Sequence, residues 1–160
     1  MVLRLVFFRH GEAVPVEEAG SDEERWLTEK GREDVRLVAR LLPCKPSLVV
    51  HSPLRRARET AEIIASIHGV EARVDERLSP GVFSFDALRE MEPGDCWVLV
   101  GHAPSINVVV SALIGGGQVK IAAGGAAYVE AEQLERGMGV LRELITPSLA
   151  RRASEALRGG

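Results

Sequence analysis

The sequence predicts an α/β fold: a single domain of three layers, in which a mostly parallel sheet is flanked by helices on both faces. Two observations lead to this prediction. Short runs rich in β-branched and aromatic residues alternate with longer segments whose apolar residues recur at helical spacing. A length of 160 residues suits one domain with one core, and no linker divides the chain. We therefore expect residues 1–160 to form one domain.

The first half of the chain alternates strands with helices. The strand runs are short and apolar, as in buried strands, except for a last one that is typical of a sheet edge. Each helical segment carries an apolar stripe and stops at Pro43 or Gly69, residues that terminate helices. The predicted strands cover 2–8, 47–52 and 70–74, and the predicted helices cover 28–42 and 54–69.

The second half continues the alternation and then changes character. After a short helix, an apolar strand and another helix, two strand runs follow each other closely and suggest a hairpin. The chain closes with an amphipathic helical pattern. The predicted elements are a helix over 85–91, a strand over 96–102, a helix over 104–116, a hairpin of 126–131 with 137–144, and a helix over 147–160.

Composition excludes several classes of protein. The net charge of −3 and the lack of any apolar run near the roughly 18 residues of a membrane span argue against nucleic-acid and membrane partners. The two cysteines have no pair spacing, so neither a disulfide scaffold nor a zinc site is expected. Cys44 is predicted to be an exposed thiol and Cys96 a small core residue. With no secretory signal visible, we expect a cytoplasmic, reducing setting; the sequence leaves the oligomeric state open.

Polar side chains gather where three predicted strands end. Ligands of open α/β sheets bind beyond the carboxyl ends of the strands, so neighbouring strands would bring two histidines and two arginines together. Arginine offers a planar fork that matches phosphate oxygens, and the predicted helices beginning near Leu54 and Ser105 would point N–H groups the same way. This is the composition of a phosphate-binding site. The residues at these strand ends are Arg9, His10, His51, Ser52, Arg55, Arg56, Gly101 and His102.

Several motifs resemble one known family. "RHGEA", "LTEKG", "SPLRRARET" and "VGHAP" occur in this order and are similar to signatures of the histidine phosphatase (phosphoglycerate mutase-like) superfamily. The short chain, the "GHAP" segment and the closing "LRELITPSL" are most similar to the SixA-type phosphohistidine phosphatases. The resemblance implies a phosphoglycerate mutase-like fold and a phosphatase that works through a phosphohistidine enzyme intermediate.

Carried over to this sequence, the resemblance implies that His10 is the nucleophile and that Arg9, Arg56 and His102 bind the phosphoryl oxygens. The nearby cations would disfavour a second positive charge and so keep the imidazole of His10 neutral. Gly11 is expected among the substrate-binding residues, because it would let the backbone approach closely without a side chain in the way. No metal and no other cofactor are expected, because these groups supply the charge stabilisation that Mg²⁺ gives elsewhere.

Arg56 has arginine neighbours that could replace it. The family pattern places its arginine directly before an alanine and four residues after the serine of "SPLRRA", which selects Arg56 over Arg55 and Arg58. Arg56 also lies off the apolar stripe of its helix, so packing does not explain it. Ser52 either orients the loop or contacts the substrate; both alternatives stay open.

The general acid is the one part of the family pattern that is missing. Mutase-like members use a glutamate in a Leu-x-Glu segment after the third strand, whereas the matching stretch here, 78–80, ends in Pro80. SixA-type members resemble this chain in that respect. Glu12, two residues after His10, is either a substitute acid or a side chain that holds the loop.

The segment from Glu17 to Glu24 is strongly acidic. Such a run is usually a solvated surface, but at the rim of a phosphate site it would disfavour small, highly charged metabolites. The prediction is therefore a phosphatase that acts on phosphohistidine of a protein. The alternatives are a phosphomonoesterase for a small phosphorylated metabolite and a non-catalytic phosphate-binding module.

Overall fold

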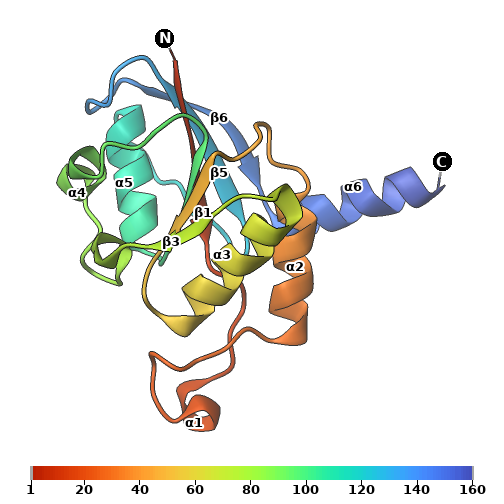
Figure 1. The fold of residues 1–160 in the computed structure, drawn as a ribbon. Coiled ribbons are helices and arrows are strands. Elements are labelled where there is room, and N and C mark those ends of the chain that lie inside the picture. Colours follow the sequence, from red (N-terminus) through yellow and green to blue (C-terminus); the bar gives the residue numbers. More distant parts are fainter. Residues whose placement is uncertain (1, 160) are drawn as a thin grey trace.

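A six-stranded sheet forms the centre of the protein, with helices on both faces (Figure 1). The structure is a computed structural model, and it describes residues 2–159. The strands are β1 (Leu3–Arg9), β2 (Leu48–His51), β3 (Ala72–Val74), β4 (Trp97–Gly101), β5 (Ala126–Ala131) and β6 (Gly139–Ile145). The helices are α1 (Val16–Ala19), α2 (Glu29–Ala39), α3 (Arg55–His68), α4 (Phe85–Glu90), α5 (Ser105–Ile114) and α6 (Pro147–Gly159), with a 3₁₀ turn η1 (Glu76–Leu78). The predicted elements are all confirmed; α1 and η1 are additional.

The strand order is β3-β2-β4-β1-β5-β6. The first four strands are parallel, while β5 runs antiparallel to β1 and forms an antiparallel pair with β6. The sheet is thus mostly parallel, as the sequence predicts. Because β4 lies between β2 and β1, the carboxyl ends of three strands meet at one edge of the sheet, where His51 pairs with Val100 and Arg9 pairs with Gly101.

The core divides into two layers because alternate residues of each strand face opposite sides of the sheet. Phe7 and Leu99 belong to the layer that packs on α4 and α5. Phe8 and Val100 belong to the layer that packs on α2 and α3, to which Ala150 of α6 adds a contact. The rest of α6 extends away from the body of the protein (Figure 1). No helix within residues 2–159 has the length and apolar character needed to cross a membrane.

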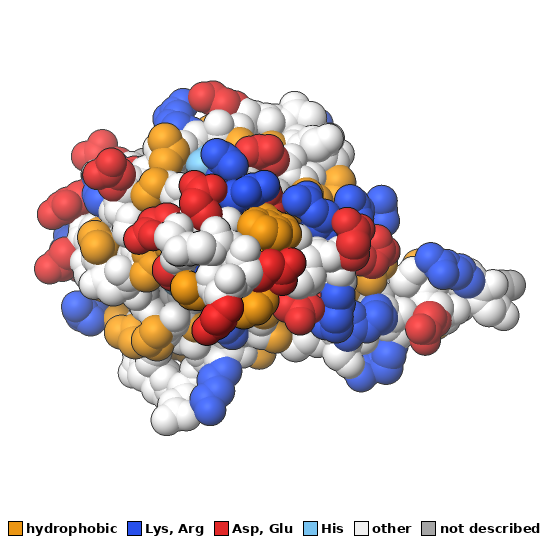
Figure 2. Space-filling view, turned by 90° about the horizontal axis from the view of Figure 1, so that it is seen from below, with side chains coloured by type: hydrophobic (Ala, Val, Ile, Leu, Met, Phe, Trp, Pro, Cys, Tyr) orange, Lys and Arg blue, Asp and Glu red, His pale blue; other side chains and the backbone are white. Residues whose placement is uncertain are grey.

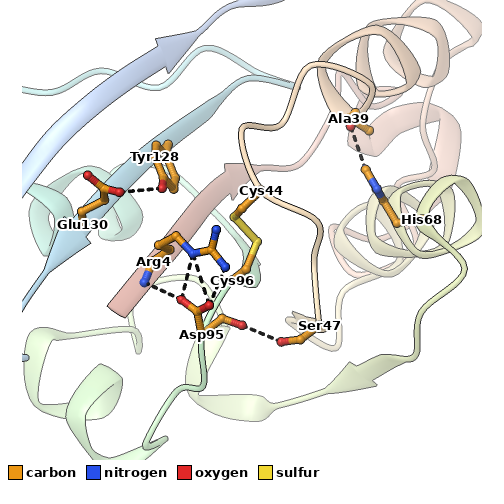
Figure 3. The surroundings of a disulfide bond; sticks show 9 residues. All are labelled: Arg4, Ala39, Cys44, Ser47, His68, Asp95, Cys96, Tyr128 and Glu130. Atoms are coloured by element: carbon orange, nitrogen blue, oxygen red, sulfur yellow. Dashed lines mark hydrogen bonds and ion pairs between the residues drawn. A yellow bond between two sulfur atoms is a disulfide. The ribbon is translucent and has the colours of Figure 1, made fainter. Parts of the chain in front are cut away.

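A disulfide joins Cys44 to Cys96 (Figure 3). The prediction of an exposed thiol at Cys44 is therefore wrong. The bond does not support the expected reducing setting, because disulfides persist mainly in oxidising surroundings. Both cysteines are buried, and Cys96 immediately precedes β4. They meet because β2 and β4 pair in parallel, with Leu48 opposite Trp97, which places the entrances of these strands side by side. Sequence spacing does not report this pairing, since the cysteines lie 52 residues apart.

We expect this disulfide to contribute to the stability of the fold. Closing a loop of this length restricts the unfolded chain, so the double variant Cys44→Ala/Cys96→Ala should lower the free energy of unfolding by about 2–4 kcal/mol in urea titrations. Single variants serve as controls, since each should lose the same stabilisation. Detection of two free thiols in the unreduced, denatured wild-type protein would contradict the bond.

Candidate active site

The carboxyl edge of β1, β2 and β4 brings the predicted polar residues together. The ring centroids of His10 and His102 lie 5.0 Å apart. Arg56, in the first turn of α3, places its Nε 3.3 Å from Nε2 of His10, and the hydroxyl of Ser52 lies 2.7 Å from Nε2 of His102. Side chains from three strand ends and one helix thus form a single cluster. Arg9 completes it from the last position of β1.

The imidazole of His10 has a defined protonation state. Its Nδ1 lies 2.8 Å from the carbonyl oxygen of Gly11, which can only accept, so Nδ1 carries the proton. Nε2 therefore has a lone pair, consistent with the N–H that Arg56 donates to it. Burial lowers the pKa of His10 to about 4; the Gly11 carbonyl opposes this shift and the charge of Arg56 adds to it. The ring is neutral at pH 7.

Gly11 positions this ring through its backbone. Its N–H donates to Oγ1 of Thr60, whose own hydroxyl donates to the carbonyl of Arg56. A Cβ on Gly11 would lie 2.9 Å from the carbonyl oxygen of Gly31 in α2, so only glycine allows this close approach. The N–H of Gly11 is thus engaged with Thr60, and its carbonyl orients the ring of His10. The sequence pattern carried no signal for Thr60, because threonine within a helix is ordinary.

Arg9 and His102 each have a buried nitrogen without a hydrogen-bond partner in the part of the chain that the structure describes. Within residues 2–159, the only buried side-chain nitrogens or oxygens that lack a hydrogen-bond partner are Nε of Arg9 and Nδ1 of His102. Another nitrogen of Arg9, Nη1, donates to the carbonyl of Ile121 at 3.1 Å, and this bond holds the guanidinium in place. Burial lowers the pKa of His102 to about 3, and the neighbouring His10 and Arg56 add to the shift. Two unsatisfied nitrogens in one cluster suit a polar ligand.

Ser52 is placed by its own hydrogen bonds. Its hydroxyl accepts the N–H of Leu54 at 3.2 Å and contacts Nε2 of His102 at 2.7 Å. When the hydroxyl donates to Nε2, the proton of the neutral His102 ring resides on Nδ1, the atom without a partner. The hydroxyl of Ser52 is therefore engaged with His102 and with the start of α3. Of its two predicted roles, these contacts favour orienting the loop.

Arg56 alone among its neighbours enters the cluster. Its side chain is only 6% exposed, whereas that of Arg58 is 52% exposed and pairs with Glu62. The guanidinium of Arg55 lies over the ring of Trp26 and pairs with Glu59. The geometry therefore assigns Arg56, not Arg55 or Arg58, to the cluster.

Asp22 is a residue of the cluster that the sequence reasoning missed. Its carboxylate lies 3.2 Å from Nη2 of Arg56, and its backbone carbonyl accepts a hydrogen bond from Nη1 of Arg56 at 2.7 Å. Arg25 donates to the other carboxylate oxygen at 3.3 Å. Partial burial raises the pKa of Asp22, but the bond from Arg25 and the charge of Arg56 outweigh it, so the pKa is lowered. Asp22 is thus an anion at neutral pH.

The acidic segment therefore borders the cluster instead of being a merely solvated surface. The loop that carries α1 hangs below the strand ends in Figure 1, and Figure 2 views the molecule from that side, where acidic and basic side chains lie next to one another. Glu23 accepts the N–H of Arg55 through its carbonyl, and Glu24 pairs with the side chain of Arg55. These contacts fix the loop to the start of α3.

Glu12 and Pro80 supply no acid at the reactive ring. The carboxylate of Glu12 accepts from the hydroxyl of Thr28 at 3.3 Å and lies 3.9 Å from Nζ of Lys30, so it faces the start of α2. Of the two roles predicted for Glu12, these contacts favour holding the loop. Pro80 lies just before Gly81, whose N–H donates to Ser105 at the start of α5. It sits at the sheet edge but has no proton to transfer.

The other two histidines each bond to a backbone carbonyl oxygen rather than to the clustered side chains. His51 bonds the carbonyl of Ser52 through Nδ1, and His68 bonds the carbonyl of Ala39 through Nε2, each at 2.8 Å. Among residues 2–159, no group of three or more His, Cys, Asp or Glu side chains is arranged to hold a metal ion.

Comparison with other sequences finds relatives. Residues 5–80 match the sequence profile of the histidine phosphatase superfamily (branch 1). An uncharacterized protein of Picosynechococcus sp. is 38% identical over 117 aligned residues, which cover 66% of this chain and 69% of the relative.

Comparison with solved structures shows the same fold. The protein histidine phosphatase SixA complexed with tungstate has a TM-score of 0.80 at 23% identity, covering 91% of this chain and 98% of its own. A mycobacterial glucosyl-3-phosphoglycerate phosphatase has a TM-score of 0.69 at 21% identity, covering 91% and 99%. A phosphoserine phosphatase of Entamoeba histolytica reaches 0.65 at 16% identity, covering 90% and 97%. The phosphoglycerate mutase-like fold predicted from the sequence is thereby confirmed.

The lowered pKa values of the two clustered histidines predict their titration. In ¹⁵N-labelled protein, the ring of His10 should titrate near pH 4 and that of His102 near pH 3, well below the unperturbed value of about 6.5. Because the unfolded state binds protons at higher pH than the folded state, both groups should destabilise the fold as the pH falls from about 6.5 toward 4.

Spectra of His10→Asn and His102→Asn assign the signals. Removing a nearby positive charge in Arg56→Ala should move the midpoint of His10 upward. A wild-type midpoint for His10 at or above pH 6 would contradict the neutral resting state.

Proposed function

The chain belongs to the histidine phosphatase superfamily (branch 1), and from this premise we propose that it hydrolyses phosphohistidine on a protein, with His10 as the nucleophile. One observation carries the proposal. Nε2 of His10, which holds the lone pair, lies 3.3 Å from Nε of Arg56, and the ring of His102 is 5.0 Å from that of His10. Arg9 and His102 each have a buried nitrogen without a partner within residues 2–159. A tetrahedral phosphoryl group would satisfy these donors and place its phosphorus before the lone pair.

The reaction follows from this arrangement in two displacements. Nε2 of His10 attacks phosphorus as the bond to the leaving group breaks, which forms a phosphohistidine on the enzyme. Nδ1 of the phosphorylated ring keeps its proton and donates it in a hydrogen bond to the carbonyl of Gly11, which stabilises the positive charge that develops on the ring. Water then attacks the phosphorus of this intermediate, inorganic phosphate leaves, and the neutral ring of His10 is restored. Arg9 and Arg56 stabilise the equatorial oxygens in both steps.

Asp22 has a distinct place in this scheme. It accepts hydrogen bonds from two N–H groups of Arg56, which a phosphoryl group would also use. A substrate therefore competes with Asp22 for Arg56, and additional negative charges near the phosphoryl group meet the acidic loop. This arrangement disfavours small, multiply charged metabolites and favours a phosphoryl group carried on a neutral imidazole.

The lack of a poised acid supports the phosphohistidine substrate. Pro80 cannot transfer a proton, Glu12 contacts Thr28, and the pKa of Asp22 is lowered. An alkoxide leaving group needs a positioned acid, which typically contributes about 10²–10⁴-fold. Imidazole does not, because its second nitrogen can be protonated near neutral pH, given an unperturbed pKa of about 6.5.

We expect a covalent phosphoenzyme on His10. Brief incubation with ³²P-labelled substrate, quenching without acid, and peptide mapping should place the label in the peptide that contains His10. His10→Ala should lose the label and the activity, and Arg56→Ala should lower kcat by about 10²–10³-fold, as removal of a transition-state donor does. His68→Gln is the matched control and should keep both. Label on His102 would overturn the assignment.

We also expect a preference among leaving groups. The wild-type protein should hydrolyse a phosphohistidine peptide best, an aryl phosphate less well, and an alkyl phosphate at least about 10²-fold more slowly than the aryl ester, measured as kcat/KM. A metabolite phosphatase of the same fold makes the alkyl ester the informative comparison. Equal or faster turnover of the alkyl ester would favour the small-metabolite alternative.

Two carboxylate variants refine this test. Glu12→Gln should leave the cleavage of all three substrates unchanged, because Glu12 faces α2. Asp22→Asn should retain cleavage of the phosphohistidine peptide. A selective loss of ester cleavage in Asp22→Asn would instead identify Asp22 as an acid for P–O bonds.

A further inference from the structure

Helices α4 and α5 lie on the same face of the sheet (Figure 1). A groove of about 910 Å³ runs along α5. It begins at Pro104, close to His102, and reaches the glycines 115–117 beyond the end of the helix. Its far wall includes Lys120 and Arg136. The ten residues of α5 give it a length of about 15 Å, far longer than a phosphoryl group and comparable to a stretch of about five extended residues.

The groove adjoins the phosphate site, because residues next to its lining contact Arg9. Lys120 immediately precedes Ile121, whose carbonyl accepts a hydrogen bond from Nη1 of Arg9 at 3.1 Å. The N–H of Ile121 donates to Oδ1 of Asn107, which also lines the groove, at 3.2 Å. The segment that forms a wall of the groove therefore also positions a phosphate-binding cation. Anything bound at His10 extends into the groove if it leaves the site toward α5.

The lining suits a polypeptide with apolar side chains. Val108 of α5 lines the groove and is 64% exposed, and Ala112 lines it one helical turn later. At the end of α5 the wall is bare backbone, because a Cβ built on Gly116 or Gly117 meets nothing within 4 Å. An exposed apolar strip beside uncovered backbone offers both side-chain and main-chain contacts.

The charge of the groove is opposite to that of the loop at the other side of the site. No Asp or Glu lines it, and neither Lys120 nor Arg136 forms an ion pair with a carboxylate within residues 2–159. The guanidinium of Arg136 is instead held over the ring of Phe85, 4.8 Å from its centroid. An acidic segment would therefore be attracted toward α5 and repelled from the acidic loop that contains Asp22.

We propose that this groove binds the segment next to the phosphorylated histidine of a protein substrate, and that it selects segments with apolar residues flanked by acidic ones. The inference rests on the proposed function and names the part of the substrate that is recognised. Apolar side chains pack on Val108 and Ala112, and carboxylates meet Lys120 near the site and Arg136 at the far end. Free phosphohistidine fills the phosphate site alone and gains none of these contacts.

Synthetic peptides test the selection directly. Each carries one phosphohistidine with a flank of about five residues, placed on its N-terminal side in one peptide and on its C-terminal side in the other. A flank of this length spans the groove. One pair has an acidic-apolar-acidic flank and a second pair has lysine in place of each acidic residue; free phosphohistidine is the reference. We expect kcat/KM for the acidic peptide of the preferred direction to exceed that for the lysine peptide and for free phosphohistidine by about tenfold or more.

Variants locate the effect. Val108→Asp and the double variant Lys120→Glu/Arg136→Glu should raise KM for the acidic peptide about tenfold, with kcat/KM for free phosphohistidine unchanged. The double variant should also improve turnover of the lysine peptide, which a merely structural defect would not do. Val74→Asp and Arg73→Glu are matched controls on exposed positions of the edge strand β3 and should behave like wild type.

The outcomes separate the groove from the activity. If the acidic peptide is cleaved no better than free phosphohistidine, or if the variants treat all peptides alike, the groove inference is wrong while the proposed function stands. If no phosphohistidine substrate is cleaved, the proposed function fails; groove-dependent binding of the labelled acidic peptide to His10→Ala, followed by anisotropy, would still support the groove. A wild-type dimer that Val108→Asp converts to a monomer would make this face a self-interface and overturn the inference.

Discussion

The chemistry of this site depends on one hydrogen bond, from Nδ1 of His10 to the carbonyl of its neighbour Gly11. The bond decides which nitrogen holds the proton and therefore which nitrogen is nucleophilic. It requires the backbone after β1 to turn close against α2, where a side chain on Gly11 would collide with Gly31. Thr60 ties the same turn to Arg56. The tautomer of His10 and the position of Arg56 are thus set by one tightly packed turn.

Electrostatics around that turn favour a neutral ring among cations. Burial is the largest influence on the pKa of both His10 and His102, and the arginines strengthen it. Among residues 2–159, Asp22 supplies the only carboxylate that pairs with Arg56, and Arg25 and Arg56 keep it ionised. Such surroundings suit an anion, but among residues 2–159 no group of the cluster is ready to protonate a leaving group. This combination suits transfer from a nitrogen better than from an alkoxide.

The surroundings of the site are asymmetric. The loop with α1 presents carboxylates on one side, whereas the α5 groove presents Lys120, Arg136 and an exposed valine on the other. The two sides are connected to the phosphate cluster through Asp22 and through Ile121, respectively. Substrate orientation can follow from this polarity alone, since an acidic chain has only one favourable direction in which to leave the site.

The sequence by itself determined the elements, their order and most of the cluster. Apolar periodicity is local, so strands and helices could be predicted from neighbouring residues, and Arg9, His10, Arg56 and His102 were identified because they follow strands or open a helix. The roles proposed for them came from the resemblance to a family. What only the tertiary structure decided depends on contacts between distant segments. The disulfide formed because β2 pairs with β4, and Asp22 entered the site because its loop folds back onto α3. Glu12 lies two residues after His10, but its carboxylate faces α2, because the turn of the backbone between them points the two side chains to different places.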